Sequence, residues 1–121
     1  MKTTLVQWDA DAYKEYKELE QAVQQNKKNN KKPTYEQLIT SIDKTIENLK
    51  KNPFYGDLVP RKYLTKKIIE EYGTDKIFRT ELVGYWRMLY TVIGDETTII
   101  ALILEYMDHP TYDKKFGYKK H

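Results

Sequence analysis

The first third of the chain predicts a short strand followed by an amphipathic helix. Leu5 to Trp8 is an apolar-rich run typical of a strand, and Asp9 directly behind it is suited to cap a helix. Apolar side chains then recur on one helical face, at Ala12, Tyr16, Leu19 and Val23. Residues 26–32 contain only Asn and Lys, so we expect the helix to end there in a polar loop.

A second helix is predicted after Pro33. Thr34 can cap it, and Gln37 three residues later completes a capping-box pattern. One apolar stripe then runs to Lys51, through Leu38, Ile42, Ile46 and Leu49. Two helices joined by a short loop form an antiparallel pair, and their apolar stripes need a sheet to cover.

The second half of the chain predicts an antiparallel β-meander. Its three runs are 77–83, 85–93 and 97–107, separated by Gly84 and by a Gly94-Asp95 turn. The third run is apolar at both parities between 99 and 104, which indicates a central strand buried on both faces. If this strand has a free edge, the N-terminal strand is its natural partner.

The segments that flank the meander are less regular. Residues 54–60 form a turn-rich connection, and 61–72 carry a short helix that Gly73 would close. His109-Pro110 ends the last strand, and 112–121 form a basic, aromatic tail. The fold class expected is therefore α+β, one domain over residues 1–121, with an N-terminal strand, a two-helix antiparallel hairpin and a three-stranded meander.

Composition narrows the class of protein. The 121 residues are 40% hydrophobic and 32% charged, and contain no apolar run long enough to span a membrane or to serve as a signal peptide. Cysteine is absent, which excludes disulfides and Cys-ligated zinc. Nucleotide-binding glycine loops, nucleophile elbows and paired metal-ligand spacings are also missing. We expect a cytoplasmic protein with no metal, no cofactor and no membrane partner.

The net charge of +3 is modest, but the charges are unevenly distributed. Basic residues gather in three segments, namely Lys27, Lys28, Lys31 and Lys32; then Lys50, Lys51, Arg61, Lys62, Lys66 and Lys67; then Lys114, Lys115, Lys119 and Lys120. Carboxylates crowd the first helix instead. This distribution is compatible with a basic face for phosphate, and equally with lysines that simply keep loops soluble.

Two arginines of the meander are candidates for chemistry. If Gly84 is the centre of the hairpin, Glu81 lies opposite Arg87, and both share a face with Arg79. The group is then either a surface salt bridge or a pair of guanidiniums that clamps phosphate. A shift of one residue in the turn would send Arg87 to the other face.

Residues 105–118 gather groups that can transfer protons. His109 is the internal histidine of the chain and titrates near neutrality, so it is either a turn residue or a proton carrier. Three aromatic residues after it, Tyr112, Phe116 and Tyr118, either stack on unpaired bases or pack the tail onto the sheet.

From Asn52 to Tyr118 the chain resembles the RelE/ParE superfamily of toxins from type II toxin–antitoxin pairs. The resemblance lies in the element order and in the segments Ile77-Phe78-Arg79-Thr80-Glu81-Leu82, Gly84-Tyr85-Trp86-Arg87-Met88-Leu89-Tyr90-Thr91-Val92 and His109-Pro110-Thr111-Tyr112-Asp113-Lys114-Lys115-Phe116-Gly117-Tyr118. Archaeal RelE-like members are the most similar.

The resemblance implies a ribosome-dependent endoribonuclease that cleaves mRNA, neutralised by a small, acidic antitoxin. It assigns Arg79 and Arg87 to phosphate charge, His109 or Glu105 to proton transfer, and Tyr112 to stacking on or orienting a base. The RNA-binding residues expected around them are Arg61, Lys62, Lys66, Lys67, Lys114, Lys115 and Tyr118. Two other functions stay open: a ParE-type toxin that inhibits gyrase, and a toxin-fold domain that only binds RNA or an antitoxin.

Overall fold

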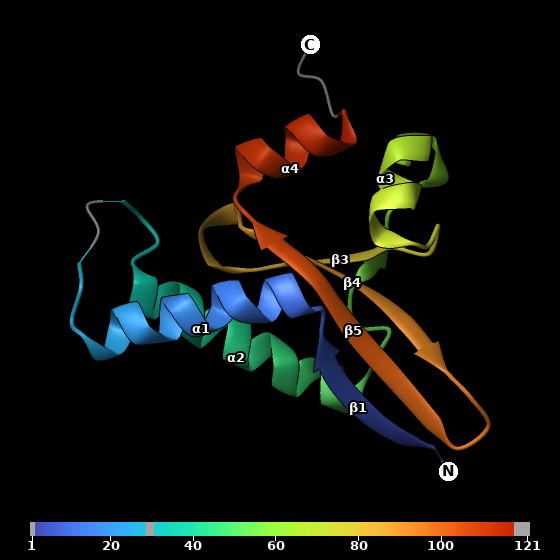
Figure 1. Cartoon of the computed structure of the whole chain (residues 1–121), viewed down its shortest axis with the longest axis horizontal. Helices are drawn as coiled ribbons and strands as arrows, with labels where there is room; N and C mark the ends of the chain where they lie inside the picture. The colour runs from blue at the N-terminus through green and yellow to red at the C-terminus, as the bar shows by residue number, and fades with distance from the viewer. Residues whose placement is uncertain (1, 29–30, 118–121) are drawn as a thin grey trace.

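The computed structural model describes residues 2–28 and 31–117 (Figure 1). The strands are β1 (Thr3–Trp8), β2 (Asp57–Leu58), β3 (Phe78–Glu81), β4 (Arg87–Gly94) and β5 (Thr98–Met107). The helices are α1 (Ala10–Gln24), α2 (Tyr35–Lys51), α3 (Lys66–Tyr72) and α4 (His109–Phe116), with 3-10 turns η1 (Arg61–Tyr63) and η2 (Val83–Tyr85).

The strands form one mixed sheet in the order β1-β5-β4-β3-β2. β1 pairs with β5 in parallel, and the other neighbours are antiparallel. The N-terminal strand is therefore the partner of the apolar third run, as predicted. The predicted meander is only part of the sheet, because the short β2, which lacks any apolar periodicity, adds a fifth strand at the far edge.

Helices α1 and α2 cover one face of the sheet, where the larger core lies. Asp9 caps α1 by accepting a hydrogen bond from the Asp11 amide, and Thr34 with Gln37 forms the predicted capping box of α2. Leu38, Ile42 and Leu49 of α2 pack on the sheet beside Leu19 of α1. The caps and the apolar faces predicted for both helices are therefore the ones seen in the structure.

The opposite face is covered by α3 and α4. Gly73 ends α3 in the left-handed conformation, as the sequence indicated. The expected tail is wrong over its first part, because residues 109–116 form a helix. Asp108 caps α4 and Gly117 ends it, while Tyr112 and Phe116 are buried against the sheet. Among the described residues, no helix is long and apolar enough to cross a membrane.

A β-bulge interrupts the β4–β5 ladder where Leu89 pairs with Glu105 and Tyr90 with Ile103. Leu104 is the extra residue, and it packs in the core beneath α3 and α4. The carboxylate of Glu105 also contacts α3, through the Tyr72 hydroxyl. Two successive residues therefore serve the same side of the sheet, which a regular strand does not allow.

Candidate functional site

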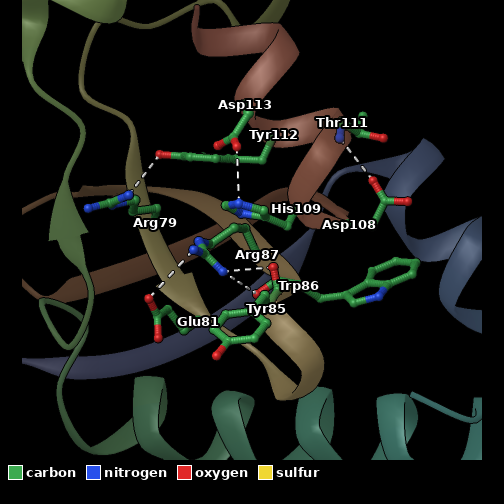
Figure 2. Close-up of polar contacts among 10 residues, drawn as sticks. All are labelled: Arg79, Glu81, Tyr85, Trp86, Arg87, Asp108, His109, Thr111, Tyr112 and Asp113. Carbon is green, nitrogen blue, oxygen red and sulfur yellow. Dashed lines mark hydrogen bonds and ion pairs between the residues drawn. The ribbon is translucent and has the colours of Figure 1, made fainter. Parts of the chain in front are cut away.

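The β3–β4 hairpin places its charged residues as the sequence predicted. Glu81 pairs with Arg87 in the ladder, and Gly84 is the centre of the connection. Arg79 and Arg87 both lie beneath α4, with their guanidiniums 5.8 and 5.6 Å from the centre of the Tyr112 ring. The two arginines therefore converge on one side of the sheet (Figure 2).

Arg87 is occupied by internal contacts. It is 7% exposed, and its Nη1 donates to the backbone carbonyls of Tyr85 at 2.7 Å and Trp86 at 3.4 Å. Its Nη2 lies 3.6 Å from the Glu81 carboxylate, and its buried Nε has no partner among the described residues. A guanidinium held in this way fixes the turn after β3 rather than meeting a phosphate, which corrects the role expected for Arg87.

Tyr112 is 1% exposed and lies between the helix and the two arginines. Arg79 donates to its hydroxyl at 3.3 Å, and Phe116 packs against its ring at 4.8 Å. A ring buried on both sides has no face left for a nucleobase. The stacking role expected for Tyr112 and Phe116 is therefore wrong, and their function is to attach α4 to the sheet.

His109 begins α4 and is more exposed than Arg87 and Tyr112. Its side chain is 39% exposed, and Nε2 lies 3.0 Å from the Asp113 carboxylate one turn later. Its Nδ1 is buried without a hydrogen-bond partner among the described residues. Next to it, hydrogen bonds from Thr111, including the backbone amide at 3.0 Å, hold the pKa of the Asp108 carboxyl below its usual value.

Glu105 does not join the arginines. Its carboxylate accepts a hydrogen bond from the Tyr72 hydroxyl at 2.7 Å. Burial and this bond raise the pKa of Tyr72 above its ordinary value. Glu105 also faces α1, where burial first and the Glu105 charge second raise the pKa of Glu15. The carboxylate is thus held by Tyr72, yet it also lines one groove with His109, and its proton-transfer role stays a prediction.

A groove of about 1050 Å³ opens beside His109, and we call it the α4 groove. It lies between the start of α4, the η2 turn, the segment before α2 and the middle of α1. Its apolar floor contains Leu38, Trp86 and Tyr106, and its rim is charged on two sides. Lys31 and Lys32 stand near the η2 turn, and Glu15, Glu18 and Glu105 form an acidic wall.

The predicted RNA-binding residues divide into two groups. Arg61 pairs with Asp75 at 2.8 Å, Lys115 pairs with Glu71 at 2.9 Å, and Lys62 lies over the Tyr63 ring. The remaining members that the structure describes are exposed on α3 and α4: Lys66, Lys67 and Lys114. Tyr118 lies outside the described residues. Fewer basic side chains are therefore available to RNA than the sequence predicted.

Tyr85 was not among the site residues predicted from the sequence. The ring is 71% exposed, the highest value among the large apolar residues described, and it lies 6.2 Å from the His109 ring. Its backbone has φ 63°, a left-handed conformation that costs a residue with a side chain about 1–2 kcal/mol. An aromatic residue directly after a turn glycine was the signal that the sequence offered. No group of three or more metal-ligating side chains occurs among the residues described.

The fold of the chain is similar to that of a solved structure. A YoeB/ParE toxin from Agrobacterium tumefaciens matches with a TM-score of 0.55 over 87% of this chain and 98% of that chain. The chain has the fold of the YoeB/ParE toxins. Sequence identity to that toxin is 15%, and neither a protein-family model nor a curated protein sequence matches. The toxin fold predicted from the order of elements is thus confirmed as a fold.

Proposed function

We propose that this protein is the toxin of a type II toxin–antitoxin pair, an archaeal RelE-like member that cleaves mRNA on the ribosome. One observation carries the proposal: the partly exposed His109–Asp113 pair and Tyr112 share α4, Arg79 donates to the Tyr112 hydroxyl, and His109 lines the α4 groove. The toxin fold supports it. An imidazole supported by a carboxylate can transfer the proton in RNA cleavage through the 2′-hydroxyl, and a guanidinium can stabilise the phosphorane charge.

In this reaction the 2′-oxygen attacks the adjacent phosphorus, and the bond from phosphorus to the 5′-oxygen breaks. His109 accepts the proton of the 2′-hydroxyl, and Asp113 stabilises the imidazolium that forms. Nδ1 is buried and Nε2 contacts Asp113 in the unbound structure, so this step requires the His109 ring to rotate when RNA binds, and catalytic hydrogen bonds often form only in the bound complex. Arg79 stabilises the charge on the phosphorane, and solvent protonates the leaving 5′-oxygen.

The test is translation of a defined message in a reconstituted system, with cleavage mapped by primer extension. We expect codon-associated cuts from the wild type, reduced about 100-fold or more in His109→Ala and in Arg79→Ala. Lys50→Ala is the matched control, because Lys50 pairs with Glu47 on α2, far from the groove. Circular dichroism verifies that each variant folds. Undiminished cutting by both site variants would refute the assignment.

A second function, toxicity without catalysis, is favoured by one observation. Arg87 and Tyr112, two of the residues that the resemblance assigned to catalysis, are buried in internal contacts. A ParE-type gyrase inhibitor or a binding domain needs no such residues. Intact message together with inhibited supercoiling by purified gyrase would establish the gyrase function, and toxicity with neither effect would leave a binding domain.

The proposal includes a small antitoxin as partner. An acidic antitoxin suits the exposed basic residues of α3 and α4, and the edge strand β1 and the α4 groove offer backbone and apolar contacts. Co-expression with a neighbouring small reading frame is the simplest check. Rescue of growth and co-purification are expected, and a harmless chain with no such neighbour would argue against a toxin.

A further inference from the structure

The η2 turn holds an aromatic side chain in solvent by an unusual arrangement of the backbone. Gly84 and Tyr85 both have positive φ, 64° and 63°. Gly84 is required there, because an added Cβ would lie 2.7 Å from the Pro33 ring. Tyr85 carries a large side chain, for which this conformation is unfavourable, yet it keeps the left-handed conformation and its ring is exposed to solvent. Backbone strain of this kind persists only where the surroundings enforce it.

The surroundings of η2 enforce it from three directions. Arg87 Nη1 binds the Tyr85 carbonyl from inside the molecule. The Val83 amide donates to the Ser41 hydroxyl of α2 at 2.9 Å, and the Leu82 amide donates to the Trp86 carbonyl at 2.8 Å. The turn is therefore fixed to both the sheet and α2. An exposed ring on a fixed turn loses little backbone freedom when it binds a ligand.

The place of the Tyr85 ring indicates what it binds. It lines the α4 groove with His109, and the planes of the two rings are inclined at 53° to each other. Lys31 and Lys32 line the same groove, with Asp108 within reach of the Lys31 charge, while Glu15 and Glu18 line it from α1. An aromatic face near cations suits a base joined to a phosphate, and the carboxylates of α1 disfavour a phosphate on their part of the groove; Lys32 is the cation left for the phosphate, because Lys31 lies near Asp108.

We infer that Tyr85 is the residue on which an unpaired RNA base stacks, with His109 at its edge and Lys32 beside the adjoining phosphate. This inference rests on the proposed function and deepens it, because it names single-stranded RNA as the ligand of the groove. It also assigns a role to Arg87, which is a positioning residue that holds the Tyr85 backbone in place without touching RNA.

The test is direct binding of a short, fluorescein-labelled oligouridine RNA, measured by fluorescence anisotropy without ribosomes. We expect Tyr85→Ala and Tyr85→Leu to weaken binding about 5- to 100-fold, the range supplied by stacking one base. Tyr85→Phe keeps the ring face and should bind like the wild type. Tyr55→Ala is the matched control, since Tyr55 is also exposed but does not line the groove.

Salt dependence separates stacking from charge. Tyr85→Ala should leave the slope of log affinity against log salt unchanged, whereas Lys32→Ala should reduce its magnitude by roughly 0.7. The inference is overturned if the wild type does not bind the RNA, or if Tyr85→Ala and Tyr85→Leu bind as tightly as Tyr85→Phe. It is also overturned if Tyr85→Ala spares RNA binding and disrupts only a complex with a protein partner.

Failure of the inference and failure of the proposed function are distinguishable. Tyr85-dependent binding of RNA without cleavage on ribosomes supports the stacking residue and refutes the nuclease. Cleavage that Tyr85→Ala leaves unchanged, with equal RNA affinity, supports the nuclease and refutes the stacking residue.

Discussion

At the residue scale, Glu81 and Arg87 form an ion pair whose two members have unequal surroundings. Glu81 projects into solvent, where its charge is hydrated whether or not the pair forms. Arg87 is buried and donates to two backbone carbonyls of the turn that carries Tyr85. Arg87 therefore stabilises the fold mainly through its hydrogen bonds to the backbone, and the ion pair with Glu81 contributes little to the free energy of unfolding.

This difference gives the first prediction. Arg87→Met should lower the free energy of unfolding by about 1.5–3 kcal/mol, because a hydrogen bond from a charged donor is lost. Glu81→Ala should change it by less than about 1 kcal/mol. Urea unfolding of both variants measures the contrast. Equal losses of stability would mean that Arg87 stabilises the fold through the ion pair with Glu81 and not through its hydrogen bonds to the turn.

At the element scale, α4 shows which sequence signals were available and which were missed. The cap of α2 was predicted because Thr34 and Gln37 carry a local pattern. The cap of α4 has a comparable pattern, Asp108 followed by Thr111, but Pro110 favoured reading the end of a strand instead of the first turn of a helix. Tyr112 and Phe116, four residues apart, mark its buried face.

The cap of α4 gives a prediction about pH. The pKa of Asp108 is lowered by its hydrogen bonds with Thr111, so the carboxylate stabilises the fold above the unfolded value of 3.8 and this effect is lost as pH falls below it. Asp108→Asn keeps an acceptor but removes the charge. We expect it to be about 0.3–1 kcal/mol less stable than the wild type at neutral pH.

The difference between the wild type and Asp108→Asn should shrink as pH falls from about 3.8, and thermal unfolding at several pH values measures it. Asp108→Ala removes the acceptor as well and should be less stable by about 1 kcal/mol at neutral pH. A difference between wild type and Asp108→Asn that stays constant down to pH 2 would show that the charge does not stabilise α4.

At the scale of the whole molecule, one sheet is covered on both faces, by α1 and α2 on one side and α3 and α4 on the other. The apolar third run predicted this burial, and it occupies an internal position as β5. The site was less predictable. Strand alternation placed Arg79 and Arg87 together, but their burial depends on α4, a helix that packs over them from outside the hairpin.

Several tyrosine hydroxyls are buried or bonded to a carboxylate in the fold. Burial first, and then nearby carboxylates, raise the pKa of Tyr72 and Tyr106, and burial with a bond to Asp43 raises that of Tyr16. These phenols ionise more readily in the unfolded chain, so their contribution to stability is present below pH 10 and is lost as pH rises above it.

Spectrophotometric titration at alkaline pH checks this expectation. The native protein should ionise fewer than its 11 tyrosines before unfolding, and the rest should ionise together with the loss of the circular dichroism signal. Tyr72→Phe should reduce the coupled group by one. Complete titration of all tyrosines while the fold persists would contradict the burial of these hydroxyls.

The parallel pairing of β1 with β5 has a consequence for synthesis of the chain. Residues 3–8 are synthesised about ninety residues before residues 98–103, but their place in the sheet is beside them. Contacts between such distant segments form slowly and late. A nascent chain interrupted before Thr98 lacks the strand that joins β1 to β4, so incomplete translation products cannot assemble the sheet or the groove built upon it.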